Sequence, residues 1–186
     1  MRRAAICFAS VFAVLGTSAR ALTAPELQRL LQSEPARELA FEELRESPWL
    51  AAPVASRGTL HGNGQRLEKR VRHPRAETWR LLPDRIEWVG ADASQTRQMR
   101  LADAPALATL AGALRHVIAG DVQALERDFV LDLRGDAGAW TLLLSPRADS
   151  SARQIDHLEL QGAGPRLHQI VVVERQGERT ITRIVR

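Results

Sequence analysis

The chain contains 186 residues, of which 45% are hydrophobic and 26% are charged. Its 26 basic and 22 acidic residues leave a formal net charge of +4, and every basic residue except Lys69 is an arginine. This length suits a single domain, and so small an excess of charge disfavours a nucleic-acid-binding protein, which needs a strong positive field.

The first 21 residues have the pattern of a secretory signal peptide. Arg2 and Arg3 precede an uncharged, largely apolar run that ends near Gly16, and small polar residues then lead to Ala19-Arg20-Ala21. This run is too short for a membrane-spanning helix, which needs ~20 apolar residues. We therefore predict a cleaved signal peptide over residues 1–21, a single mature domain over residues 22–186, and a location in the periplasm of a Gram-negative bacterium.

Removal of the predicted signal peptide changes the chemistry of the mature chain. Cys7, the only cysteine, leaves with it, as do three arginines and no acidic residue. The mature chain then has 23 basic and 22 acidic residues, a net charge of +1. Without a thiol it forms no disulfide, so its stability must come from its core.

A helix is predicted at the start of the mature chain, followed by a series of strands. The segment Thr23-Ala-Pro-Glu26 is a capping box, and the apolar residues that follow it recur at helical spacing up to Pro35. From about residue 38, short alternating runs separated by Gly, Pro and Asn predict six or so antiparallel strands.

A helical insertion interrupts the predicted strands. After Asp103, a candidate N-cap, apolar residues recur at helical spacing up to Gly120, and a short helix over 121–127 follows. Five further strands are predicted over 129–134, 139–144, 153–160, 167–174 and 179–185. A sheet of about eleven antiparallel strands must curl. We therefore predict an α+β fold: an unclosed β-barrel with an N-terminal helix and an inserted helical lid that covers an apolar cavity. The alternative is that the helices and the sheet pack solidly.

The sequence contains no pattern typical of an enzyme or a metal site. The five histidines lack the spacing of metal ligands, and neither a nucleophile elbow nor a Gly-rich phosphate loop is present. The acidic pairs Glu42-Glu43 and Asp132/Asp136 are not arranged for joint acid–base catalysis. We predict no catalytic residue, no metal ion and no cofactor.

Large apolar side chains instead indicate a binding site between the sheet and the inserted helix. Tryptophans and aliphatic residues that share a strand face can form ordinary core, or can line a pocket for acyl chains. The predicted lining of the apolar cavity consists of Trp79, Leu81, Ile86, Trp88, Leu107, Leu110, Leu114, Trp140, Leu142 and Leu144.

Several short patterns together resemble the LolA-like outer-membrane lipoprotein carrier family. They cover nearly all of the mature chain: Phe41-Glu-Glu-Leu-Arg45, Gly58-Thr-Leu60, Leu67-Glu-Lys-Arg70, Pro74 with Glu77, Ala119-Gly-Asp121, and Trp140 to Pro146. The resemblance implies an unclosed β-barrel with a helical lid over a hydrophobic cavity. It also implies a carrier that takes acyl-bearing cargo across the periplasm without catalysing a reaction.

Two departures from the family pattern bear on the cargo. Family members usually have an Arg-Pro step followed by Phe and Trp, with the Arg in contact with the lid, whereas this chain has His73-Pro74 and then Glu77 before Trp79. The resemblance makes His73 the expected polar gate beneath the lid, and Glu77 requires a partner such as an arginine. These changes favour a divergent branch that carries other lipidic products over classical lipoprotein delivery.

Three functional hypotheses follow. The first is a monomeric periplasmic carrier that shuttles lipidic or acylated cargo from an inner-membrane exporter to an outer-membrane acceptor. The second is a periplasmic lipid-sensing or interaction module of a regulatory system. The third, a hydrolase or isomerase, requires that His73 lie within hydrogen-bond reach of an acid in an open pocket.

Overall fold

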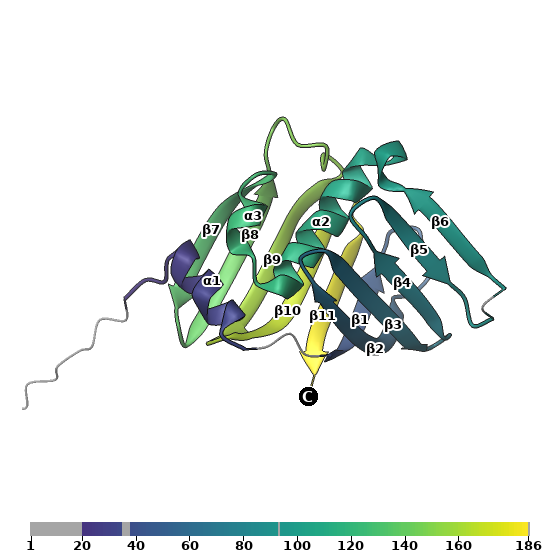
Figure 1. The fold of residues 1–186 in the computed structure, drawn as a ribbon, viewed down its shortest axis with the longest axis horizontal. Helices are drawn as coiled ribbons and strands as arrows, with labels where there is room; N and C mark the ends of the chain where they lie inside the picture. The colour runs from purple at the N-terminus through teal and green to yellow at the C-terminus, as the bar shows by residue number, and fades with distance from the viewer. Residues whose placement is uncertain (1–19, 35–37, 93, 186) are drawn as a thin grey trace, which may run out of the picture.

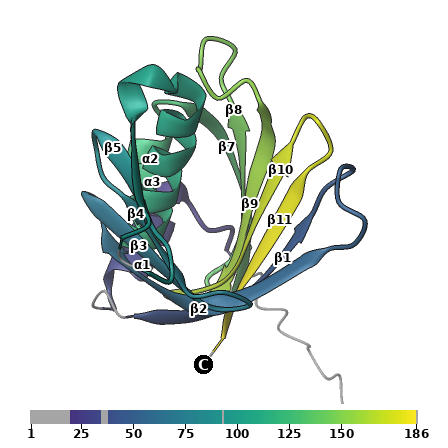
Figure 2. The ribbon, with the colours of Figure 1, turned by 90° about the vertical axis from the view of Figure 1, so that its right-hand side faces the viewer.

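The computed structural model describes residues 20–34, 38–92 and 94–185, so nearly all of the predicted signal peptide lies outside the described residues. One curled antiparallel sheet carries the helices on its concave side (Figures 1 and 2). Its eleven strands are β1 (Leu39–Glu46), β2 (Val54–Asn63), β3 (Arg66–His73), β4 (Glu77–Leu81), β5 (Arg85–Val89), β6 (Thr96–Arg100), β7 (Phe129–Asp136), β8 (Ala139–Pro146), β9 (Ile155–Ala163), β10 (Arg166–Glu174) and β11 (Arg179–Val185).

The first and last strands join two meanders into a single sheet. The strand order is β6-β5-β4-β3-β2-β1-β11-β10-β9-β8-β7, so β1 pairs with β11 and the edges are β6 and β7. In this pairing Phe41 lies opposite Ile184, and Glu43 lies opposite Thr182. The predicted unclosed sheet of about eleven strands is confirmed.

The N-terminal helix α1 (Ala24–Gln32) begins where the capping box predicts. A carboxylate oxygen of Glu26 accepts hydrogen bonds from the backbone N–H of Thr23 at 2.9 Å and from its hydroxyl at 2.7 Å. This fixes the entry of the chain into the helix, and Leu27 on the apolar stripe is fully buried. The helix packs against α3 (Val122–Leu125), where Gln28 accepts the backbone N–H of Gln123.

The inserted helix α2 (Pro105–Ala119) ends as predicted but begins differently. Gly120 stops it with a φ of 67°, a left-handed conformation that suits glycine. Its N-cap is Ala104, because Asp103 lies in the short 3-10 helix Leu101–Asp103 and pairs with Arg100. The predicted cap at Asp103 is therefore wrong. Among the described residues, no helix combines the length and the apolar character that a membrane crossing requires.

The main core lies between α2 and the wall formed by β7 to β10. Leu142, Leu144 and Leu158 are fully buried there, and each contributes about 1.5–3 kcal/mol through the removal of apolar surface from water. Trp140 lies in the same core directly over Gly162, where an added Cβ would be 2.1 Å from the ring and 2.3 Å from the backbone oxygen of Arg166. Only glycine fits at this position.

The Gly162→Ala variant should lower the free energy of unfolding by about 2–4 kcal/mol, because the new methyl group displaces both a buried ring and a strand backbone. Urea unfolding monitored by tryptophan fluorescence measures the change. The matched control is Gly64→Ala, since an added Cβ there meets no atom within 4 Å. Equal stability of the two variants would contradict the packing described here.

Candidate functional site

Helix α2 crosses the concave side of the sheet and contacts both of its halves (Figure 2). Leu114 and Ile118 pack against the main core and also against a second cluster of buried residues on the first three strands. These two side chains are only partly buried, as are others on the same stripe of the helix. The second cluster consists of Phe41, Leu60, Leu67 and Val71. The helix thus lies where a lid over the concave face would lie.

A groove opens between the sheet and the C-terminal end of α2. It has a volume of about 530 Å³, within the usual range for small-molecule sites, and it borders α1, β1, β10 and β11. Charged side chains such as Glu34 and Arg166 also line it. Its larger apolar lining residues include Leu31, Leu39, Val117, Ile118, Leu167 and Ile184. None of the ten predicted lining residues lines this groove.

The predicted lining residues fall into three groups instead. Trp140, Leu142 and Leu144 are fully or almost fully buried in the main core, and the Trp140 indole N–H donates to the carbonyl of Gly164 at 3.0 Å. Leu107, Leu81 and Ile86 form a third cluster with Leu101 and Ala111, while Leu110 and Leu114 pack against the main core. Trp79 and Trp88 remain partly exposed. Around Trp140, Leu142 and Leu144 the helices and the sheet therefore pack solidly, which is the alternative that the sequence left open.

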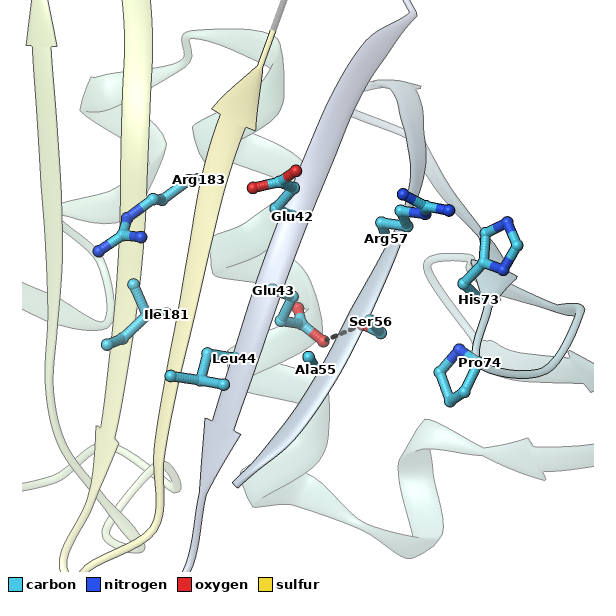
Figure 3. Close-up of a pocket in the computed structure, with 10 residues that line it drawn as sticks. All are labelled: Glu42, Glu43, Leu44, Ala55, Ser56, Arg57, His73, Pro74, Ile181 and Arg183. Atoms are coloured by element: carbon cyan, nitrogen blue, oxygen red, sulfur yellow. Dashed lines mark hydrogen bonds between the residues drawn. The ribbon is translucent and has the colours of Figure 1, made fainter. Parts of the chain in front are cut away.

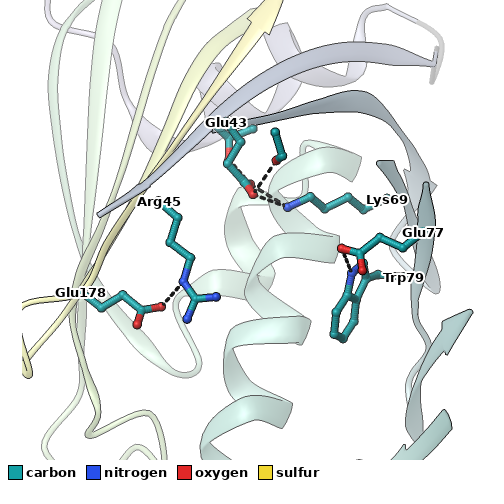
Figure 4. A network of polar contacts seen from close by, with 8 residues as sticks. Glu43, Arg45, Lys69, Glu77, Trp79 and Glu178 are labelled. Carbon is teal, nitrogen blue, oxygen red and sulfur yellow. Dashed lines mark hydrogen bonds and ion pairs between the residues drawn. The ribbon is translucent and has the colours of Figure 1, made fainter. Parts of the chain in front are cut away.

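A polar network lies on the concave face between these apolar groups (Figure 4). Lys69 of β3 donates to both carboxylate oxygens of Glu43 on β1 at 2.6 and 2.7 Å, and Thr182 of β11 donates to the same carboxylate at 2.9 Å. The Lys69 ammonium also lies 5.1 Å from the centroid of the Phe41 ring. The floor of the concave face is therefore partly charged, and these charged residues were not among those expected to line the apolar cavity.

A second ion pair extends this network toward the β10–β11 turn (Figure 4). Arg45 donates to Glu178 at 2.8 Å, and this hydrogen bond raises the pKa of Arg45 above its usual value. Burial, followed by the nearby Glu178 charge, raises the pKa of the Glu174 carboxyl. Opposite charges thus lie side by side along this end of the floor.

Glu77 bridges two tryptophans on the same face. Its two carboxylate oxygens accept the indole N–H of Trp79 at 3.0 Å and that of Trp88 at 2.8 Å. The two rings have centroids 6.4 Å apart and are tilted by 58°. The partners that Glu77 was expected to need are therefore the two indoles and not an arginine, and no described residue forms an ion pair with this carboxylate.

One hydrogen bond from the middle of α2 reaches the sheet. Arg115 is buried, its Nη1 donates to the backbone carbonyl of Leu82 in the β4–β5 turn at 2.9 Å, and its Nε has no hydrogen-bond partner. Burial lowers the pKa of this guanidinium. A buried cation with so few partners is a weakly stabilising contact. A single side-chain hydrogen bond of Arg115 therefore joins α2 to this turn.

His73 lies on the opposite, convex face of the sheet (Figure 3). It is exposed, its register partner is Arg57, and it borders a groove of about 420 Å³. The other lining residues are Glu42, Glu43, Leu44, Ala55, Ser56, Pro74, Ile181 and Arg183. This position does not agree with a polar gate beneath α2. Among the described residues, no carboxylate forms a hydrogen bond or ion pair with His73, so the geometry that the enzyme hypothesis requires is not found.

Sequence reasoning missed the residues that surround the groove and form the charged floor. Leu39 and Ile184 border the groove from strands at opposite ends of the chain, and the partners Glu43 and Lys69 are joined only by strand pairing. The alternation of these residues along each strand was the available signal, but it does not show which strands are neighbours. Within the described ranges, no three His, Cys, Asp or Glu side chains form a group that could hold a metal ion.

Solved structures to which the chain is distantly similar include two from bacteria. A LolA superfamily protein from Nitrosomonas europaea is 11% identical with a TM-score of 0.49, over 89% of this chain and 93% of that one. A DUF1329 family protein from Desulfovibrio piger is 11% identical with a TM-score of 0.45, over 86% of this chain and 89% of that one. No curated protein matches the chain. The family assignment does not depend on these likenesses.

The family assignment comes from a comparison with protein-family models. The model described as "Outer membrane lipoprotein carrier protein LolA-like" matches residues 16–185. This range includes every helix and strand of the fold, and it confirms the family expected from the sequence. The chain belongs to the LolA-like family of outer-membrane lipoprotein carrier proteins.

Proposed function

We propose that the protein is a periplasmic carrier that binds a lipidic molecule between α2 and the sheet and shuttles it from the inner to the outer membrane. The observation that carries this proposal is the groove of about 530 Å³ at the C-terminal end of α2, with its apolar lining, in a chain of this family. Burial of apolar surface contributes about 0.8 kcal/mol per methylene group, so one acyl chain supplies enough free energy for tight binding.

The contacts of α2 suit a lid that moves. Leu114 and Ile118 are only partly buried although they touch both halves of the sheet, and Arg115 has a single hydrogen bond to the β4–β5 turn. Displacement of α2 would expose Phe41 and Leu60 on the sheet, which together with the groove offer a longer apolar path for a chain.

The proposed cargo is a lipidic product other than a lipoprotein. The position of His73 on the convex face supports this, because the residue at the family's Arg position then makes no contact with the lid. An inner-membrane exporter that loads the carrier and an outer-membrane acceptor that unloads it are the partners this function requires. The carrier itself is expected to act as a monomer.

Native mass spectrometry of the protein purified from its own periplasm tests the carrier function directly. We expect a fraction of the molecules to retain a lipidic adduct that dissociates at raised collision energy, because an acyl chain in an apolar groove is released slowly. Protein that is always empty and that also fails to bind acyl probes would contradict the proposal.

The Ile118→Trp variant should weaken the binding of a fluorescent fatty-acid probe by about tenfold, because the larger side chain fills part of the groove. The control is Val130→Trp, which makes the same enlargement at a residue that is 53% exposed on β7. Probe titration measures both variants. An unchanged affinity in folded Ile118→Trp would mean that the groove is not the binding site.

The Arg115→Met variant should take up the same probe several-fold faster than the wild type. Its global stability should change by about 1 kcal/mol or less, because the lost hydrogen bond is offset by the removal of a buried charge. Stopped-flow fluorescence measures the uptake rate, and Arg127→Met at an exposed ion pair is the control. Equal uptake rates in all three proteins would show that Arg115 does not hold the lid.

A further inference from the structure

The two tryptophans and the carboxylate on the concave face form a group that the apolar groove does not explain. Trp79 is 37% exposed although it points to the side of the sheet that carries α2 (Figure 4). Glu77 accepts hydrogen bonds from both indoles and so holds the two rings at a fixed tilt. Exposure of an indole ring to water is unfavourable. An exposed ring that is held next to a fixed carboxylate therefore suggests a ligand-binding site.

The charges around this group favour a cation. The hydrogen bonds of Glu77 come from neutral indole groups, and among the described residues no cation is ion-paired with it. The neighbouring Lys69 is already neutralised by Glu43. A negative charge next to an electron-rich ring attracts an ammonium group, since both the carboxylate and the face of the ring stabilise positive charge.

The protein itself places a cation on one of the two rings. The guanidinium carbon of Arg97 on β6 lies 5.6 Å from the centroid of the Trp88 ring, and these residues are register partners. No such contact is found for Trp79 among the described residues. The arrangement is thus half of an aromatic cage in which Trp88 is occupied from within the chain and Trp79 is left for a ligand.

Trp79 lies in the same row of the sheet as one residue of the groove. Successive strand pairings place Trp79 opposite Lys69, Lys69 opposite Leu60, and Leu60 opposite Leu39, so all four lie in one row of the concave face. Leu39 lines the groove at the end of this row. Three strand spacings separate Trp79 from Leu39, about 14 Å, which a chain of about a dozen carbons can cross beneath α2.

We propose that the cargo carries an ammonium head group, bound by Trp79 and Glu77, while its apolar chain lies along this row and ends in the groove. The proposal rests on the carrier function proposed above and specifies the class of cargo. Two kinds of cargo contain the alkylammonium group that this site would bind: a zwitterionic lipid and a simple cationic amphiphile.

Isothermal titration with dodecyl amphiphiles, kept below their critical micelle concentrations, tests the proposal. Dodecyltrimethylammonium should bind the wild-type protein about tenfold more tightly than the uncharged dodecyl maltoside, and dodecyl sulfate should bind most weakly. Dodecylphosphocholine distinguishes the two sources: an affinity equal to that of dodecyltrimethylammonium indicates a zwitterionic lipid, and a weaker one a simple cationic amphiphile.

The Glu77→Gln variant should lose the tenfold preference for the ammonium while it keeps its affinity for dodecyl maltoside. Glu42→Gln is the matched control, because it removes the same charge from the convex face and should keep the preference. Trp79→Leu, which retains apolar surface but no ring, should also lose the preference. Circular dichroism confirms that each variant is folded.

The outcomes separate this proposal from the carrier function. Binding of all the amphiphiles without a preference for the ammonium, or an unchanged preference in Glu77→Gln, would overturn the head-group proposal and leave the carrier intact. Failure of every amphiphile to bind the wild-type protein would overturn the carrier function and the head-group proposal with it.

Discussion

The pairing of β1 with β11 is the constraint on which the rest of the structure depends. It joins residues near both ends of the chain, such as Phe41 and Ile184, and turns two separate meanders into one continuous concave surface. It also leaves β6 and β7, which are consecutive in the chain, at opposite edges of the sheet. The segment between them must therefore cross from edge to edge, and its apolar helix α2 crosses over the concave face.

Local chemistry was enough to predict most of the elements of the fold. The capping box at Thr23, the helical spacing before Gly120 and the turn residues between strands each act within a few residues. They predicted the two main helices and a sheet of about eleven strands because such signals require no knowledge of distant partners. The cap at Asp103 failed because a local pair with Arg100 holds this residue in a 3-10 turn.

The candidate site was predicted less well because its residues depend on which strands become neighbours. Trp140 looked like a cavity residue, but Gly162 on the adjacent strand leaves room for its ring in the core. Glu77 looked like a buried charge that needs an arginine, but strand pairing brings Trp88 within 2.8 Å of it. In both cases a partner on another strand, which a single sequence does not specify, decides the role of the side chain.

The charged floor of the concave face has a consequence for the chemical reactivity of the protein. Lys69 is the only lysine in the chain, and its ammonium lies between Glu43 and the Phe41 ring beneath α2. The other basic side chains are guanidinium groups, which do not react as amines. Apart from the chain terminus, the folded protein therefore offers one amine to acylating reagents. In the proposed carrier that amine would lie beneath bound cargo, so its rate of acylation would distinguish the empty protein from the loaded one.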